Sequence, residues 1–128
     1  MAFMKKYFNG LLFAIALLFL LLVGLVLKPV PKIAESEAIK VTGKVAGVYQ
    51  TGIKDVHIAI EGSQQNYYIN RGVEAGLDIQ ELNNRLLGQE VTLYFPKYWT
   101  PLDWNNRVRH LSRVDHSGQI IYTELLTD

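Results

Sequence analysis

The alternation of hydrophobic and polar positions divides this chain into two parts. From Gly10 to Leu27 the sequence reads GLLFAIALLFLLLVGLVL, without a charged or strongly polar residue. As an α-helix this segment would be about 27 Å long, close to the roughly 30 Å hydrocarbon core of a bilayer. A helix in lipid also satisfies its own backbone hydrogen bonds. We therefore expect residues 1–27 to form a short tail and a transmembrane helix.

A cleaved signal peptide is the alternative interpretation of the same segment. Its apolar region usually spans about 7–15 residues and ends at a site with small residues at positions −3 and −1. The best small residue downstream is Ala34, and Lys32 occupies its −3 position. A lipid-modified N-terminus would need a cysteine, and the sequence has none. These features favour a retained signal-anchor.

The charges around the apolar segment bear on its orientation. Lys5 and Lys6 precede it with the α-amino group, whereas Lys28 and Lys32 follow it. The positive-inside rule therefore favours a cytoplasmic N-terminus only slightly. A very short tail before the helix and a whole domain after it suit a translocated domain. We expect a single-pass protein of the cell (inner) membrane whose C-terminal domain is periplasmic or otherwise extracytoplasmic.

The pattern after the apolar segment changes to that of β-strands. Residues 28–37, which include Pro29 and Pro31, read as a juxtamembrane stalk because proline cannot continue a helix. Alternation then predicts a strand that is bent or bulged at its glycines. Its inward-facing positions would be Ile39, Val41, Gly43, Val45, Gly47 and Tyr49.

Further elements follow from local signals. Alternating residues predict strands near 56–61, 65–70 and 91–95. Asp78 followed by Glu81 predicts the start of a helix that ends at Gly88. Segments 107–114 and 119–124 flank a turn-like stretch at 115–118, which predicts a hairpin.

The order of three strands, a helix and then further strands resembles the OB-fold, a five-stranded barrel. The resemblance covers roughly residues 38–125 and rests on element order and glycine placement. It implies a mainly β domain at 38–128 with one short α-helix. A different small β-barrel with one helix is the alternative.

An anchor followed by an OB-like domain is also similar in architecture to the periplasmic haem chaperones of cytochrome c maturation. In that family a histidine near the C-terminus binds haem and a tyrosine follows four residues later. Here His116 and Tyr122 are six residues apart, so the pattern is absent. No haem-binding residue is carried over from the family, and no cofactor is expected.

The densest candidate site is the segment YFPKYWTPLDW at 94–104, with five aromatic residues. Rigid aromatic rings make good anchors for a protein partner or a sugar. Two other interpretations stay open: Phe95 and one tryptophan belong to the core while the other rings cap the open end of the barrel, or Tyr98 and Trp99 lie at the lipid headgroups. The arginines at 107, 109 and 113 could grip an anionic partner or form the solvated side of an edge strand. The expected partner- or ligand-binding residues are Tyr94, Tyr98, Trp99, Trp104, Arg107 and Arg109.

Metal, catalytic and nucleic-acid sites have little support in the sequence. His57, on the outward face of a strand, His110, in the last sheet, and His116, in a turn, have no metal-ligand spacing. No serine lies in a nucleophile motif, and there is no cysteine. Without Lys5 and Lys6 the chain has 11 basic and 12 acidic residues, whereas nucleic-acid binders carry a basic excess.

The function that these patterns favour is a non-enzymatic accessory domain, tethered to the membrane, that binds another envelope protein. The alternative is a small-ligand carrier for haem, a lipid fragment or a glycan, which would use the face of the barrel. An enzyme is the third hypothesis, and no substrate can be named for it.

Overall fold

The computed structural model describes residues 1–127 and contains two compact units. The helix unit consists of Met1–Pro29 together with Trp99–Trp104, and the β unit consists of Val30–Tyr98 together with the chain from Asn105 onward. Each unit is described by itself below.

The helix unit is dominated by α1 (Ala2–Val26), a continuous helix of 25 residues. None of its side chains is buried in the structure. Among residues 1–127 it is the helix that is long and apolar enough to cross a membrane, judged by length and composition. It begins eight residues before the apolar stretch at Gly10, because the residues from Ala2 onward include good helix formers and no proline.

The β unit contains a seven-stranded mixed sheet in the order β5-β3-β2-β1-β4-β6-β7. Neighbouring strands are antiparallel except β3 and β5, which are parallel. The strands are β1 (Ile39–Thr51), β2 (Asp55–Ile60), β3 (Asn66–Ile69), β4 (Glu90–Phe95), β5 (Val108–His110), β6 (Arg113–His116) and β7 (Gln119–Thr123). Two short 3-10 helices, η1 (Glu35–Glu37) and η2 (Pro101–Asp103), complete the chain.

The long strand β1 changes partner halfway along its length. Residues 39–44 pair with β4, and residues from Val45 onward pair with β2. The register shifts between Val45 and Gly47, so Ala46 is an extra residue in the strand. The predicted bulge is therefore present. Its effect on the alternation was not predicted: beyond the bulge Val48 is buried and Tyr49 is exposed, whereas the sequence pattern places Tyr49 inside.

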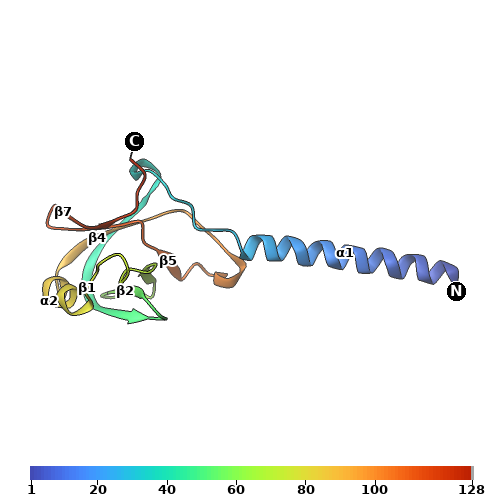
Figure 1. Ribbon diagram of the computed structural model, residues 1–128, viewed down its shortest axis with the longest axis horizontal. Helices are drawn as coiled ribbons and strands as arrows, with labels where there is room; N and C mark the ends of the chain where they lie inside the picture. Colours follow the sequence, from blue (N-terminus) through green and yellow to red (C-terminus); the bar gives the residue numbers. More distant parts are fainter. Residues whose placement is uncertain (128) are drawn as a thin grey trace. The chain divides into compact units, whose positions relative to one another are not determined.

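The second helix, α2 (Ile79–Leu86), lies against β1 (Figure 1). The Asp78 side chain accepts a hydrogen bond from the backbone N–H of Glu81 (2.8 Å), as the capping pattern predicts. Gly88 ends the helix at a φ of +75°, where a side chain would be strained. Its N–H donates to the carbonyl of Val45, which ties the end of the helix to the bulge of β1.

The core of the β unit lies between the inner face of the sheet and α2. Leu82 and Leu86 are the buried residues of the helix. The buried cluster comprises Val45, Val48, Val56, Ile58, Ile60, Tyr67, Ile69, Leu82, Leu86, Val91, Leu93, Phe95, Leu111 and Val114. Alternate residues of β2 and β4 supply much of it, as the strand patterning predicts.

The fold prediction is confirmed at the level of a mainly β domain preceded by a long apolar helix. A closed five-stranded barrel is not confirmed, because the sheet has seven strands and its order runs from β5 to β7 without closing. The domain is loosely compatible with an OB-like fold. The hairpin turn is shorter than expected: Ser117 and Gly118 both have positive φ and form it, and His116 belongs to β6.

Candidate functional site

The six residues predicted to bind a partner do not fall in one unit. Trp99 and Trp104 belong to the helix unit, whereas Tyr94, Tyr98, Arg107 and Arg109 belong to the β unit. Arg107 is exposed, and Tyr98 and Arg109 are partly buried. The Arg109 guanidinium carbon lies 5.2 Å from the centre of the Phe95 ring. Their role in binding stays a prediction.

The two tryptophans contact each other within their loop. Their ring centroids are 5.4 Å apart with an angle of 70° between the planes, and Trp99 Nε1 donates to the carbonyl of Trp104 (3.1 Å). Between them, Thr100 caps η2 and Pro101 begins it. The exposed fractions are 41 % for Trp99 and 77 % for Trp104. The loop therefore has internal order while its rings remain accessible.

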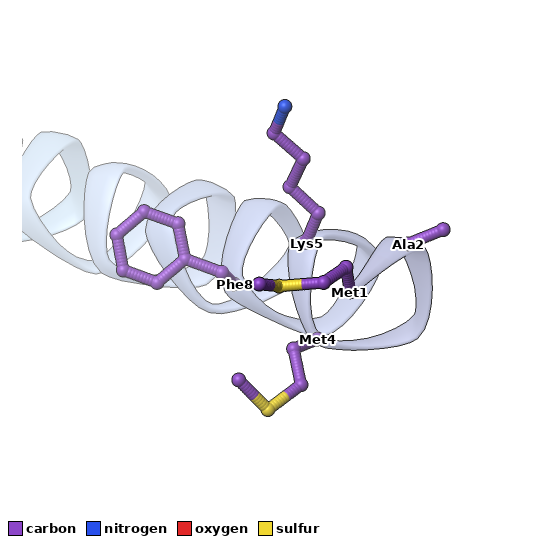
Figure 2. A pocket seen from close by; sticks show the side chains of 5 residues that line it. All are labelled: Met1, Ala2, Met4, Lys5 and Phe8. Carbon is purple, nitrogen blue, oxygen red and sulfur yellow. The ribbon is translucent and has the colours of Figure 1, made fainter.

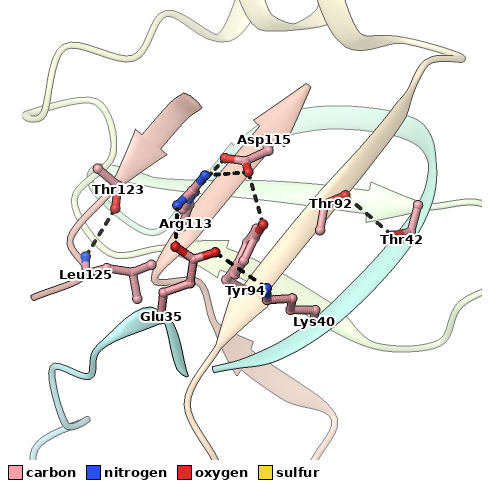
Figure 3. A network of polar contacts seen from close by, with 9 residues as sticks. All are labelled: Glu35, Lys40, Thr42, Thr92, Tyr94, Arg113, Asp115, Thr123 and Leu125. Carbon is pink, nitrogen blue, oxygen red and sulfur yellow. Dashed lines mark hydrogen bonds and ion pairs between the residues drawn. The ribbon is translucent and has the colours of Figure 1, made fainter. Parts of the chain in front are cut away.

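Tyr94 lies in a polar network instead of on an open surface (Figure 3). Its hydroxyl donates to Asp115 Oδ2 (3.1 Å), and Arg113 donates to both carboxylate oxygens of Asp115 (2.7 and 2.8 Å). Burial, followed by the hydrogen bond to Asp115, raises the pKa of the Tyr94 phenol. The arrangement suits a structural role for this tyrosine.

The network continues into the segment that leads into β1 (Figure 3). Arg113 Nη1 donates to Glu35 Oε2 (3.2 Å), and Lys40 Nζ donates to Glu35 Oε1 (3.4 Å). The Arg113 side chain is only 18 % exposed. The interpretation of Arg113 as part of a solvated edge is therefore wrong, because Asp115 and Glu35 satisfy its guanidinium within the fold.

A second group of rings, which the sequence did not reveal, crosses four adjacent strands. Tyr49 on β1 is the register partner of His57 on β2, His57 is the partner of Tyr68 on β3, and Tyr68 is the partner of His110 on β5. We call Tyr49, His57, Tyr68 and His110 the ring row. Directly opposed residues lie on the same face of a sheet, so the four strands present their rings together.

The rings of the row contact one another. Tyr49 and His57 are stacked with centroids 5.4 Å apart, and His57 and Tyr68 are stacked at 5.7 Å. The His110 ring meets Tyr68 edge-on at 5.3 Å. Exposure falls along the row, from 43 % for Tyr49 to 10 % for the His110 side chain. The stacked rings therefore turn their faces toward each other.

At its buried end, the ring row contacts a carboxylate. His110 Nε2 lies 2.5 Å from Glu124 Oε1, and the Tyr122 hydroxyl donates to Glu124 Oε2 (3.0 Å). Burial alone would raise the pKa of the Glu124 carboxyl. The hydrogen bond and charge of His110, with the Tyr122 hydrogen bond, outweigh burial and place this pKa below its ordinary value. Burial and then Glu124 raise the pKa of the Tyr122 phenol.

The middle of the ring row carries no charge at neutral pH. Burial, partly offset by the Asp55 carboxylate, places the pKa of His57 below its ordinary value of 6.5. Burial, and then the charge of Asp55, raise the pKa of the Tyr68 phenol above 10. The charge of a deprotonated Tyr98 acts in the same direction on Tyr68. His57 and Tyr68 therefore form a neutral middle section of the row.

The sequence did not reveal the ring row because two features of the strand pairing are not visible in it. Tyr49 reaches the outer face only through the bulge at Ala46, and the pairing of β3 with β5 joins residues 68 and 110. Both depend on long-range strand register. The available signals were the outward position of His57 and the adjacent Tyr67 and Tyr68, of which Tyr67 faces the core.

Other hollows and clusters give no functional site. The hollow in Figure 2 is lined by Met1, Ala2, Met4, Lys5 and Phe8, all from the first turns of one helix. Within residues 1–127 no three His, Asp or Glu side chains are grouped so that they could hold a metal ion. His116 lies beside the Ser117 hydroxyl at 3.4 Å, in the strand that leads into the hairpin turn.

Comparisons with protein-family models, with curated proteins and with solved structures give no match to this chain. Its function is therefore argued from its own residues.

Proposed function

We propose that this chain is a non-enzymatic accessory protein, tethered to a membrane by α1, whose β unit binds another protein at the same membrane surface. The observation that carries the binding part of the proposal is the ring row on the outer face of β1, β2, β3 and β5.

The retained anchor is supported by the apolar surface of α1. Its 25 residues bury none of their side chains within the protein, and leucine and phenylalanine occur all around the helix. A helix that is hydrophobic on all sides needs either a protein core or lipid around it. A signal sequence would have the same properties, and the poor cleavage site around Ala34 favours retention. An N-terminus in the cytoplasm and an extracytoplasmic β unit remain part of the proposal.

An OB-like architecture is the finer fold that we infer for the β unit. Its support is the helix between the third and fourth strands and the course of residues 108–116, which pair first with β3 and then with β4. OB-folds are partly open Greek-key barrels that use the face of strands 2 and 3 to bind ligands. His57 and Tyr68 of the ring row lie on the corresponding strands.

The chemistry of the ring row favours a protein partner. Tyrosine and histidine combine an apolar ring with a polar tip, which suits an interface that is apolar in the middle and hydrogen-bonded at its rim. A nucleobase would need an open ring face on which to stack. In the ring row His57 is stacked between Tyr49 and Tyr68, so its ring faces are not open for such stacking.

Site-specific photo-crosslinking tests this proposal in the full chain. A photoreactive phenylalanine analogue at position 49 should form a covalent adduct with one defined protein in intact cells. Ile120 on β7 is a matched control position, because it is also exposed (53 %) but lies on a distant strand of the sheet. Tyr68→Ala should abolish the adduct from position 49. Equal adducts from positions 49 and 120, or none from either, would contradict the proposal.

The small-ligand carrier is the second candidate, because the ring row lies on the face that OB-folds use for small ligands. Mass spectrometry of the full chain, released intact from detergent, distinguishes the two candidates. A carrier should retain a molecule of defined mass and lose it on Tyr49→Ala. A chain that carries nothing and still forms the adduct from position 49 is an interaction protein.

A further inference from the structure

The loop Trp99–Trp104, which we call the Trp loop, exposes apolar side chains to solvent. The exposed fractions are 41 % for Trp99, 77 % for Leu102 and 77 % for Trp104. Soluble surfaces carry single exposed apolar residues routinely, but three within six residues form a patch that needs an occupant.

The loop holds these side chains in a defined arrangement. The Trp99 indole donates to the carbonyl of Trp104, and the N–H of Asp103 donates to the carbonyl of Thr100 (3.0 Å). Pro101 fixes the backbone at the start of η2. The patch is therefore preorganised, and little conformational entropy would be lost when its occupant binds.

The Trp loop belongs to the same compact unit as α1. Although it lies more than 70 residues after the helix in the sequence, η2 packs against α1. Within this unit, η2 lies beside the C-terminal end of the helix (Figure 1).

The length of the apolar stretch fixes the depth of that end in a bilayer. Residues Gly10–Leu27 span about 27 Å as a helix, nearly the full hydrocarbon core. When they fill the core, Leu27 lies at the hydrocarbon boundary and Lys28 enters the headgroup layer. A loop beside this end lies at the same depth, where tryptophan rings are enriched. Asp103 limits deeper insertion, since a carboxylate in hydrocarbon is costly.

We infer that the Trp loop is a second membrane contact, with Trp99, Leu102 and Trp104 inserted into the headgroup layer of the bilayer that α1 spans. This inference rests on the proposed anchor. The occupant of the patch is lipid, and the amphipathic indoles suit a layer that is apolar on one side and wet on the other. Trp99 and Trp104 would then fix the depth and rotation of the helix, beyond simple tethering.

The chain offers a direct test, because its two tryptophans are both in the Trp loop. Intrinsic tryptophan fluorescence of the full chain therefore reports on this loop alone. The purified chain is reconstituted into vesicles of phosphatidylcholine and phosphatidylglycerol, some with bromine near the headgroup end of the acyl chain and some with bromine near its tail. We expect blue-shifted emission, weak quenching by acrylamide, and stronger quenching by the shallow bromine than by the deep one.

Two variants refine the result. Leu102→Gln should shift the emission to the red and weaken the quenching by the shallow bromine, because it removes an exposed apolar side chain from the loop that carries both indoles. Leu126→Gln is the matched control, an equally conservative change at an exposed leucine (53 %) of the β unit, and should leave the emission unchanged.

Flotation of the same vesicles after alkaline extraction distinguishes a failure of this inference from a failure of the proposed anchor. A chain that floats with the lipid but keeps solvent-exposed emission, quenched by acrylamide and not by bromine, overturns the inference and leaves the anchor intact. Stronger quenching by the deep bromine also overturns it. These vesicles contain no other protein, so a loop reserved for a protein partner would give the acrylamide result. A chain that does not float overturns the proposed anchor, and the inference with it.

Discussion

The ring row and the Trp loop are both groups of aromatic side chains in contact, but the chain assembles them in different ways. Trp99 and Trp104 are five residues apart, and one short loop brings them together. Tyr49 and His110 are 61 residues apart, and only the register of four strands aligns them. An aromatic cluster built locally can be recognised in a sequence, whereas one built by strand pairing cannot.

The two groups also differ in what their rings do for the fold. The ring row ends at a largely buried histidine and carboxylate, and its members pack across neighbouring strands. Trp104 and Leu102 are each 77 % exposed. Substitutions in the row should therefore lower the stability of the β unit. Substitutions in the Trp loop should instead change the contact between this loop and the lipid that we propose surrounds it. The following predictions test this difference.

Joint deletion of Ala46 and Gly47 should have the largest effect, because it removes the bulge and shifts the rest of β1 by one residue relative to β2. Val48 would then oppose Ala59 and turn outward, and Tyr49 would oppose Ile58 and turn inward. Burial of one valine contributes about 1.5–3 kcal/mol, and Val48 also exchanges two backbone hydrogen bonds with the Asn83 side chain. We expect the free energy of unfolding to fall by more than about 3 kcal/mol. Urea unfolding of the full chain in detergent, followed by near-ultraviolet circular dichroism, measures it.

The control for the deletion is Ala46→Ser, which keeps the bulge and changes an exposed side chain. Its unfolding free energy should stay within about 0.5 kcal/mol of the unsubstituted chain. A deletion variant that unfolds at the same urea concentration as the control would show that the bulge does not determine which face Tyr49 occupies.

Truncation of one ring in each group should have an intermediate effect on the free energy of unfolding. The loss should be larger for the ring row than for the Trp loop. Tyr68→Ala removes the ring that contacts both His57 and His110, and should cost about 1–2 kcal/mol of unfolding free energy. Trp104→Ala should change it by less than about 0.5 kcal/mol, since the ring is mostly exposed. The same urea titration measures both. Equal losses would mean that the Trp loop supports the fold as much as the ring row does.

The smallest effect should be the pH dependence at the buried end of the row. The pKa of Glu124 in the folded chain lies below its ordinary value of 4.5, so the unfolded chain binds more protons in this range. The stability due to the carboxylate is present above about pH 4.5 and is lost as the pH falls through the folded pKa. Glu124→Gln should cost about 1 kcal/mol at pH 7, a typical net value for one hydrogen bond, and nothing below the folded pKa.

Urea titrations of the full chain between neutral and acidic pH measure this dependence. Glu61→Gln serves as the control, because Glu61 is an exposed glutamate outside the row, and its curve should parallel that of the unsubstituted chain. A constant difference between Glu124→Gln and the unsubstituted chain at every pH would show that the carboxylate of Glu124 does not contribute through its charge.

Local signals were sufficient to predict several elements of the fold. The capping pair Asp78 and Glu81, and the stop at Gly88, define α2 as predicted. The apolar stretch from Gly10 predicts α1 by length and composition, and alternation predicts β2 and β4. Each of these signals acts between residues a few positions apart, where helical or strand periodicity is directly visible.

The remaining features depend on contacts between distant segments. The face of Tyr49 depends on the bulge at Ala46. The Arg113 guanidinium donates to Glu35, which is 78 residues away in the sequence, whereas the sequence pattern favoured a solvent-exposed side chain for Arg113. Residues 108–116 form two strands, β5 and β6, because they divide between two partners, β3 and β4. None of these pairings follows from composition or periodicity.

The links around Ile33 and Glu35 have a mechanical consequence. The carbonyl of Ile33 accepts a hydrogen bond from the N–H of Leu126 (2.9 Å), and the carboxylate of Glu35 holds Arg113 of β6. Force applied to the chain at residue 30 would act on these two hydrogen bonds before it acted on the backbone hydrogen bonds between β1 and β4. In the anchored protein that we propose, these two links would protect the pairing of β1 with β4 from force transmitted along residues 28–37.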